Sequence, residues 1–590
     1  MHPSGLSTRQ RYEQSKSALL TERASFDSHW RELADNFMPR RTRFWVDDKN
    51  KGDRRNKQII DSSPRFAART LASGLHAGLT SPARPWLKLE TPDSDLNNFT
   101  PVKEWLHTVT QRMLGLFQKS NLYNVLPTCY LDMGIFGSAA FAEFEDREAI
   151  CRFYSYPLGS WVLALDDRMM PSMFLREYQL TVAQVVEQFV MVDANPRLLD
   201  WTKASTHVKD AWDRANYTSP VNLTWVASQN LDYRSGALSA ADRYPFRSCY
   251  YETGRSDADF VERDGLLKES GFRHFPVFCP RWDVTGEDTY GTDSPGMTTL
   301  GDAKQLQLMQ QHKAKGIHKM VDPPLNAPTE LKTTRVSLLP GGINYVEDAR
   351  TGGSTRGLSP VHEIRGEGLN FLIQDMGETR QRISRGYYED LFLMLALSPY
   401  GQQGGMPITA REVEERHEEK LLALGPVLER LNDELLDPLV DRTFGIMLEH
   451  GAIPPPPEEM LGMDLRIEYI SILSQAQKLV GVSGHDRFVQ AALVLNQAFP
   501  EVKHKLNVFR AIDDYAAMLG VDPHVVRDDQ DAEARLAAEQ QAMAAQAKAQ
   551  QDAVEAQTAK TLADTPINQG TSTALDATTA AMASNMSGVL

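Results

Sequence analysis

The hydrophobic positions of the N-terminal part of the chain recur with helical spacing. Tyr12 to Phe37 mixes apolar and charged residues as a surface helix does, and Ala67 to Leu79 is rich in Ala, Leu and Gly. A third helix is predicted from Pro101 to Leu116, because proline suits the first turn of a helix and Val102 begins an apolar face. The chain therefore opens with helices.

From residue 139 the period of the pattern shortens to two, which is typical of strands. Ala140-Phe141-Ala142-Glu143-Phe144 alternates, and a charged turn follows it. Further short strands are predicted at Ile150–Tyr156, Trp161–Leu165, Phe246–Tyr251 and Phe275–Trp282, with helical pieces near Val182–Phe189 and Leu198–Ala211. The predicted fold class is α+β and predominantly helical.

The next region predicts two long helices that flank an insert. Apolar residues recur at helical spacing over residues 291–320, and Asp322-Pro323-Pro324 ends that helix. A compact insert of irregular or β-type structure follows from Leu325 to Arg365. A second amphipathic helix is predicted from about Gly368 to Leu395. We therefore expect the insert at one end of a helix pair.

The segment Ser398–Pro407 is too rich in Gly and Pro to continue the second helix, so it predicts a mobile loop. It is longer than most helix connections. A simple connector remains one interpretation. The other is a functional loop, because Gln402 and Gln403 near its tip could hydrogen-bond to DNA without charge attraction.

The helix predicted from Thr409 to about Leu448 starts with a complete capping signal. Thr409 can cap the helix, and Glu412 completes a capping box. Gly425-Pro426 lies in the middle of this helix, where proline removes a backbone hydrogen bond and clashes with the preceding turn. We therefore expect a kink there, and Pro438 allows a second bend.

The C-terminal part predicts a strand at Leu465–Ile470 and then helices. Three short helices are expected at about Ser474–Val482, Asp486–Ala498 and Val508–Leu519. Residues 529–562 are rich in good helix formers, but the apolar face is weak, so this helix alone would be marginal in water. Two interpretations stay open: a helical barrel in a ring of copies, or disorder.

Charge and composition narrow the classes of function. The chain has 590 residues, 42% of them hydrophobic, and a net charge of −15, so we expect several parts around a real core. An acidic surface repels a DNA backbone, which suits a pore through which DNA slides. The four cysteines are scattered, and the chain has neither a run of about 18 apolar residues nor an apolar leader. We expect reduced thiols, assembly in a cytoplasm and no membrane partner.

The motifs that would indicate an enzyme are missing from the sequence. It contains no GxxxxGK[ST] phosphate loop, no GxSxG elbow and no HExxH pair. Adjacent acids such as Asp166-Asp167 point in different directions on a helix, and the fourteen histidines form no ligand cluster. We therefore expect no catalytic residues, no metal site and no cofactor.

The first helix of the predicted pair carries a band of positive residues within an acidic protein. The band comprises Lys304, His312, Lys313, Lys315 and Lys319. One interpretation is a solvated face that pairs with acidic neighbours. The other is a weak contact with DNA phosphates.

Four ordered blocks resemble the head-to-tail connector (portal) proteins of short-tailed bacteriophages. The first is Ile59-Ile60-Asp61-Ser62-Ser63-Pro64 with residues 71–86, and the second is Phe278-Cys279-Pro280-Arg281-Trp282 followed by Tyr290-Gly291. The third is residues 406–413 through Leu424-Gly425-Pro426, Arg430-Leu431 and Glu434-Leu435, and the fourth is residues 467–471 with Ala476-Gln477. Together they span about residues 59–477.

The resemblance implies the portal fold in a ring oligomer, usually a dodecamer. It assigns residues 1–290 to the wing, 291–320 and 366–395 to the stem helices, 321–365 to the clip, 396–408 to the tunnel loop, 409–470 to a kinked helix and returning strand, 471–528 to the crown, and 529–590 to a barrel helix and flexible tail. Candidate channel residues are Tyr400, Gln402, Gln403 and Met406 in the tunnel loop, and candidate docking residues in the clip are Lys332, Arg335, Asn344 and Tyr345.

The resemblance also implies partners and a place of action. Double-stranded DNA would pass through the channel during packaging and ejection. The terminase large subunit and tail adaptor proteins would dock at the clip, with major capsid and scaffolding proteins around the wing, at the portal vertex of the virion. The alternative is a tail adaptor or internal virion structural protein without a DNA channel.

Overall fold

The computed structural model describes residues 7–44, 55–93, 96, 99–192, 195–254, 265–326, 359–360, 366–396, 424–460, 466–469 and 529–563. The chain divides into two compact units, Met1–Pro500 and Glu501–Leu590. The first unit holds nearly all of the described residues, and every buried hydrophobic cluster among them lies in it.

Four helices form the N-terminal part of the first unit. They are α1 (Thr8–Asn36), α2 (Ser63–Leu79), α4 (Thr100–Lys119) and α5 (Leu122–Phe136). Ser7 caps α1 in a reciprocal capping box with Gln10. The pattern of the sequence predicted α1, α2 and α4 but not α5, which is mostly buried and contains Pro127.

Two antiparallel sheets of more than two strands are described in this unit. The larger has the strand order β10-β9-β8-β5-β4, and the smaller has the order β11-β2-β3. The larger sheet comprises β4 (Trp161–Leu165), β5 (Pro171–Thr181), β8 (Pro220–Gln229), β9 (Phe246–Glu252) and β10 (Leu266–Phe272); the smaller comprises β2 (Ala140–Asp146), β3 (Ile150–Tyr156) and β11 (Val277–Phe278). The observed mixture of helices and strands agrees with the predicted α+β class.

A small lobe is inserted in the chain between β5 and β8, which are neighbouring strands of the larger sheet. It contains α6 (Val182–Val185), a π-helical turn (Val186–Val190), β6 (Met191–Val192), β7 (Asn195–Leu199), a 3₁₀ turn (Trp201–Lys203) and α7 (Thr206–Asp213). The predicted helical piece over Leu198–Ala211 is thus wrong in its first half. There β7 pairs with β6. The Ser205 hydroxyl caps α7 by accepting a hydrogen bond from the Val208 amide.

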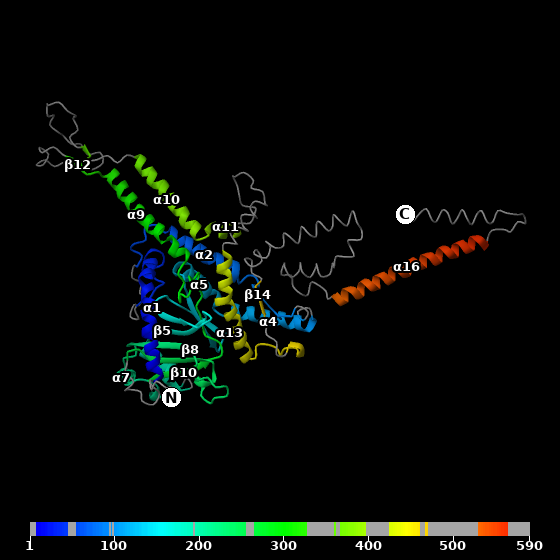
Figure 1. Ribbon diagram of the computed structural model, residues 1–590, viewed down its shortest axis with the longest axis horizontal. Coiled ribbons are helices and arrows are strands. Elements are labelled where there is room, and N and C mark those ends of the chain that lie inside the picture. Colours follow the sequence, from blue (N-terminus) through cyan, green and yellow to red (C-terminus); the bar gives the residue numbers. More distant parts are fainter. Residues whose placement is uncertain are drawn as a thin grey trace, which may run out of the picture. The chain divides into compact units, whose positions relative to one another are not determined.

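Two long helices leave this body side by side (Figure 1). They are α9 (Pro295–Val321) and α10 (Gly366–Gly386). At their far end β12 (Leu325–Asn326) pairs antiparallel with β13 (Ser359–Pro360), so the chain leaves and re-enters the helix pair through one short ladder.

The second helix of the pair is shorter than predicted. The chain turns after Gly386, where Tyr388 has a φ of +54°, and α11 (Glu389–Ala396) begins. Tyr387 is fully buried, and its ring lies 5.9 Å from that of Phe37. The single helix expected over Gly368–Leu395 is therefore wrong, because the burial of Tyr387 is accompanied by a turn that no helix accommodates.

The last long helical stretch that the structure describes in this unit runs over residues 424–449, with a π-helical turn at Asn432–Leu436 before α13 (Asp437–Glu449). Pro438 lies in the first turn of α13 and cannot donate a hydrogen bond to the preceding turn. The π-helical turn lies directly before α13, and the second bend expected at Pro438 stays a prediction. The predicted strand of residues 465–470 appears as β14 (Arg466–Tyr469), which pairs with β1 (Leu87–Glu90).

In the second unit the structure describes one helix, α16 (Asp529–Ala563). It matches the helix predicted for residues 529–562. The side chains of residues 534–558 are exposed. The three short helices expected between residues 474 and 519 lie outside the described residues.

Candidate functional site: the projecting helix pair and its anchors

The base of α9 is seated on the C-terminal turn of α5. The Ser294 hydroxyl accepts a hydrogen bond from the Met297 amide at 3.2 Å and donates one to the Ile135 carbonyl at 3.0 Å. Gly296 lies so close to the Ile135 backbone that no side chain fits there. The start of the projecting helix is therefore fixed by the body.

Asp61 joins the body to both projecting helices. It is 7% exposed and precedes α2. Gln307 of α9 accepts from the Asp61 amide at 2.8 Å and donates to its carbonyl at 2.9 Å. Arg380 of α10 donates to the Asp61 carboxylate at 2.6 Å. One residue of the first resemblance block thus ties α9 and α10 to the body.

The carboxyl of Asp61 is held in its charged form. Burial alone would raise its pKa, but hydrogen bonds from Ser63 and the pairing with Arg380 outweigh burial and hold the pKa below the ordinary value. The Ser63 amide and hydroxyl donate to Oδ1 at 2.9 and 2.6 Å. The anchor is consequently a satisfied polar network.

The positive band predicted on the first helix divides in the structure. Lys304 pairs with Glu32 of α1. His312, Lys315 and Lys319 are exposed, whereas Lys313 is half-buried. At 100° per residue, Lys313 and Lys315 point to different sides of α9. The structure therefore groups His312, Lys315 and Lys319 on one surface and removes Lys304 from it; contact with DNA stays a prediction.

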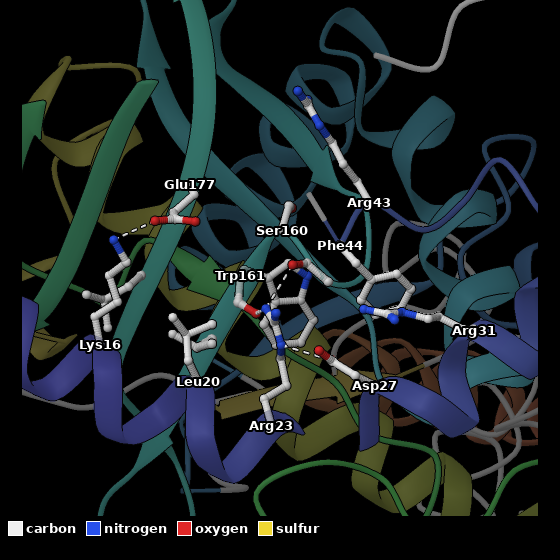
Figure 2. Close-up of a pocket in the computed structure, with 13 residues that line it drawn as sticks. Lys16, Leu20, Arg23, Asp27, Arg31, Arg43, Phe44, Ser160, Trp161 and Glu177 are labelled. Atoms are coloured by element: carbon white, nitrogen blue, oxygen red, sulfur yellow. Dashed lines mark hydrogen bonds and ion pairs between the residues drawn. The ribbon is translucent and has the colours of Figure 1, made fainter. Parts of the chain in front are cut away.

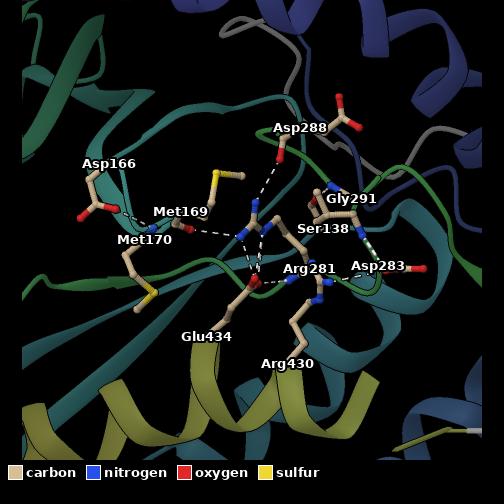
Figure 3. A network of polar contacts seen from close by, with 11 residues as sticks. Ser138, Asp166, Met169, Met170, Arg281, Asp283, Asp288, Gly291, Arg430 and Glu434 are labelled. Carbon is tan, nitrogen blue, oxygen red and sulfur yellow. Dashed lines mark hydrogen bonds and ion pairs between the residues drawn. The ribbon is translucent and has the colours of Figure 1, made fainter. Parts of the chain in front are cut away.

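A second anchor joins the last helical stretch to the body (Figure 3). Arg281 donates to Glu434 from Nη2 at 2.7 Å and from its backbone amide at 2.9 Å. The remaining donors reach the carbonyls of Asp288 at 3.0 Å and Met169 at 3.1 Å. The side chains of the pair are 5% and 10% exposed. The second and third resemblance blocks thus meet in one buried ion pair.

Sequence reasoning singled out both blocks but missed their contact. Glu434 lies within the π-helical turn of residues 432–436. Nothing in the spacing of Arg281 and Glu434, which are 153 positions apart, indicates that they pair. Arg281 is the one charged residue of the second block, whereas Glu434 is one of several charged residues in the third, so the sequence held no signal that singles out the pair.

A third contact holds α13 against β2. The Arg442 guanidinium donates to the carbonyls of His274 at 2.7 Å and Glu143 at 3.1 Å. The Thr443 hydroxyl donates to Glu143 Oε1 at 2.9 Å. Burial raises the pKa of Glu143 to about 7, although Arg442 and Thr443 act in the opposite direction.

A cavity of about 300 Å³ lies between α1 and strands β4 and β5 (Figure 2). Its charged side chains largely compensate one another: Lys16 pairs with Glu177 at 2.5 Å and Arg23 with Asp27 at 3.1 Å. Arg23 also donates to the Trp161 carbonyl at 2.8 Å. These contacts fasten α1 to the sheet, and the lining holds no nucleophile with an adjacent base.

Several predicted site residues lie outside the described residues. They are the tunnel-loop residues Tyr400, Gln402, Gln403 and Met406, the clip residues Lys332, Arg335, Asn344 and Tyr345, and the capping residues Thr409 and Glu412. Gly425 and Pro426 are described within a helix, half-buried and exposed respectively. The preceding turn is not described, so the predicted kink stays a prediction.

The described residues offer no metal centre: no group of three or more His, Cys, Asp or Glu side chains there could hold an ion. The four cysteines, Cys129, Cys151, Cys249 and Cys279, are free and buried. Among the helices described, none has the length and apolarity needed to cross a membrane. The polar networks found here fix helices and do not assemble a catalytic constellation.

Comparison with known proteins gives consistent matches. The family described as "Bacteriophage head to tail connecting protein" matches residues 9–526. The portal protein of Salmonella phage epsilon15 is 42% identical over 548 residues, covering 93% of this chain and 94% of its own length. The probable portal protein of Bordetella phage BPP-1 is 40% identical over 508 residues, covering 86% of this chain and 87% of its own.

Proposed function

The chain belongs to the family of bacteriophage head to tail connecting proteins, and from this premise we propose that it is a portal subunit of a short-tailed phage. Copies assemble into a ring, usually a dodecamer, at one vertex of the capsid. Double-stranded DNA passes through the central hole during packaging and again during ejection. The family is structural, and the proposed work of this chain is association, without catalysis.

The observation that carries the proposal is the projecting helix pair. Helices α9 and α10 leave an α+β body side by side, and Asp61 fixes both at their base through Gln307 and Arg380. A helix pair held this firmly can line a channel without yielding to the load of moving DNA. It also carries, at its far end, the β12–β13 ladder between whose strands the insert lies in the sequence.

The charge of the chain supports a conduit. A net charge of −15 in each copy disfavours tight binding of phosphates, so DNA can slide. We assign retention of packaged DNA to the tunnel loop, residues 396–408. The cations of α9 supply either weak DNA contacts or contacts between subunits.

The remaining partners follow from the proposed place at the portal vertex of the virion. The terminase large subunit and later the tail adaptor proteins dock at the insert, residues 321–365. Major capsid and scaffolding proteins surround the body, residues 1–290. Assembly takes place in the host cytoplasm.

Electron microscopy of the purified full-length chain in negative stain tests the proposal. Closed rings with a central hole are expected. Monomers or open filaments would instead favour a tail adaptor or internal virion protein without a channel. Hydrolysis of ATP by the purified chain would contradict the non-enzymatic assignment.

A further inference from the structure

The outer half of the projecting helix pair carries opposite charges on its two helices. Residues 308–321 of α9 contain Lys313, Lys315 and Lys319 and no Asp or Glu, and residues 366–378 of α10 contain only acidic charged residues. The ion pairs that described residues make on these helices use other side chains, namely Lys304, Arg380 and Arg382. Within the described residues the charges of the outer half thus make no ion pair, and Glu378 only accepts a hydrogen bond from Gln374 at 3.4 Å.

On α9 four of the exposed residues lie in one line along the helix. We call it the α9 stripe: Leu308, His312, Lys315 and Lys319, all exposed. Steps of four, three and four residues keep a line on one face of a helix. The half-buried residues Met309, Lys313 and Gly316 lie along one side of this line, and Gly316 faces Leu369 of α10.

On α10 a second line has the same steps. We call it the α10 stripe: Glu367, Phe371, Gln374 and Glu378, all exposed. Phe371 is 73% exposed, so the face of its ring is accessible to a second chain. This stripe lies away from Leu369, Leu372 and Met376, through which α10 faces α9.

The antiparallel packing puts corresponding residues of the two stripes at matching levels. A Cβ on Gly316 would lie 4.0 Å from Leu369 Cδ1, and nearer the body Asp302 pairs with Arg382. Counting outward from Gly316 and Leu369, Lys319 reaches the level of Glu367. Subunits of a closed ring are related by rotation alone, so in a helix pair that runs along the ring axis equal levels of neighbours face each other.

We propose that the α9 stripe of one subunit packs against the α10 stripe of the next, so that the stem cations bind a second copy of this chain. The inference rests on the proposed ring and names its contact surfaces. Because the two stripes are different surfaces, the contact is heterologous, and each subunit uses one stripe toward each neighbour.

The chemistry of the stripes matches from the tip toward the body. Lys319 meets the carboxylate of Glu367, and the Lys315 ammonium lies over the ring of Phe371, as cations do on aromatic faces. His312 meets Gln374, a pair able to share a hydrogen bond. These three outer levels carry the complementarity, since Leu308 and Glu378 offer each other only methylene contact.

A charge swap tests the contact on the full-length chain. The variants Lys319→Glu and Glu367→Lys each place like charges opposite one another at every contact of the ring. Each is expected to need an about tenfold higher concentration for half-maximal ring assembly, followed by mass photometry. The double variant Lys319→Glu/Glu367→Lys restores opposite charges and should assemble as the unmodified chain does.

The matched controls are Lys209→Glu on α7 and Glu148→Lys in the turn between β2 and β3, both exposed; neither should alter assembly. Rings that form equally well in both single variants overturn the inference while the proposed function stands. A double variant as defective as the singles overturns it too. If Lys315→Gln and Lys319→Gln reduce only DNA retention in particles, the cations face DNA. An unmodified chain that forms no rings refutes the proposed function itself.

Discussion

Two buried carboxylates of this chain have pKa values that are shifted in opposite directions. Asp61 is 7% exposed but accepts hydrogen bonds from Ser63 and Arg380, and its pKa lies below the ordinary value. Glu143 is fully buried, and its Oε2 accepts no hydrogen bond. Burial raises its pKa to about 7. Burial raises the pKa in both cases, and at Asp61 the hydrogen bonds from Ser63 and Arg380 outweigh it.

The raised pKa of Glu143 predicts a dependence of stability on pH. The folded chain holds this proton up to about pH 7, whereas an unperturbed Glu releases it near 4.5. The folded state thus binds more protons in this interval, so its stability falls as the pH rises. Glu143→Gln should remove a loss on the order of 1–3 kcal/mol between pH 5 and pH 8. Thermal unfolding at both pH values measures it.

The control for this prediction is Glu145→Gln, because Glu145 is exposed on the same strand. Its unfolding midpoint should shift with pH as that of the unmodified chain does. Equal pH dependence in Glu143→Gln and in the unmodified chain would show that Glu143 stays ionised when buried.

The buried pair of Arg281 and Glu434 predicts a strong effect of removing one partner. Glu434→Gln leaves the Arg281 guanidinium, 5% exposed, without its counter-charge. The free energy of unfolding should fall by about 3–5 kcal/mol. Denaturation monitored by tryptophan fluorescence measures it. Asp283→Asn, which breaks the looser 3.6 Å contact with Arg430, should cost less than about 1 kcal/mol.

At the scale of elements, periodicity predicted helices and strands that have one buried face. It found α1, α2 and α9, whose apolar residues recur on one side. It missed α5, because ten of its fifteen residues are buried and its pattern has little period. It also ran α10 through residue 386, because the packing of Tyr387 against Phe37 comes from a segment far away in sequence.

The anchor at Asp61 predicts a local effect on the projecting helices. Asp61→Ala removes the carboxylate that accepts hydrogen bonds from Arg380 and Ser63. Backbone amides of α10 should exchange hydrogen about tenfold faster, because the helix opens from the body more often. Hydrogen exchange followed by mass spectrometry measures this. Asp302→Ala, which frees the more exposed Arg382, is the control and should leave exchange near the base unchanged.

At the scale of the whole molecule, the sequence indicated an acidic, multi-part chain without enzyme motifs, and four blocks indicated the family. The physical reason for those blocks required the structure. Asp61 of the first block binds α9 and α10, and Arg281 of the second binds Glu434 of the third. Such ties join residues far apart in the chain, and no local pattern encodes which charge meets which.

Helix α16 carries three large apolar side chains that are exposed in the single chain. Leu536, Met543 and Val554 are 47%, 61% and 51% exposed. Steps of seven and eleven residues put them on one face of the helix. We therefore predict that this line is the contact between copies in a helical barrel, and that the helix depends on assembly.

Replacing these three residues by serine should lower the helical circular dichroism of assembled rings toward that of a chain cut after Asp528. Serine at Gln541, Ala545 and Lys548 is the matched control, because these positions lie off the line and the change costs similar helix propensity. The control should keep most of the signal. Equal losses of helical signal in both variants would mean that α16 is helical by intrinsic propensity alone. The line of Leu536, Met543 and Val554 would then not be a contact between copies.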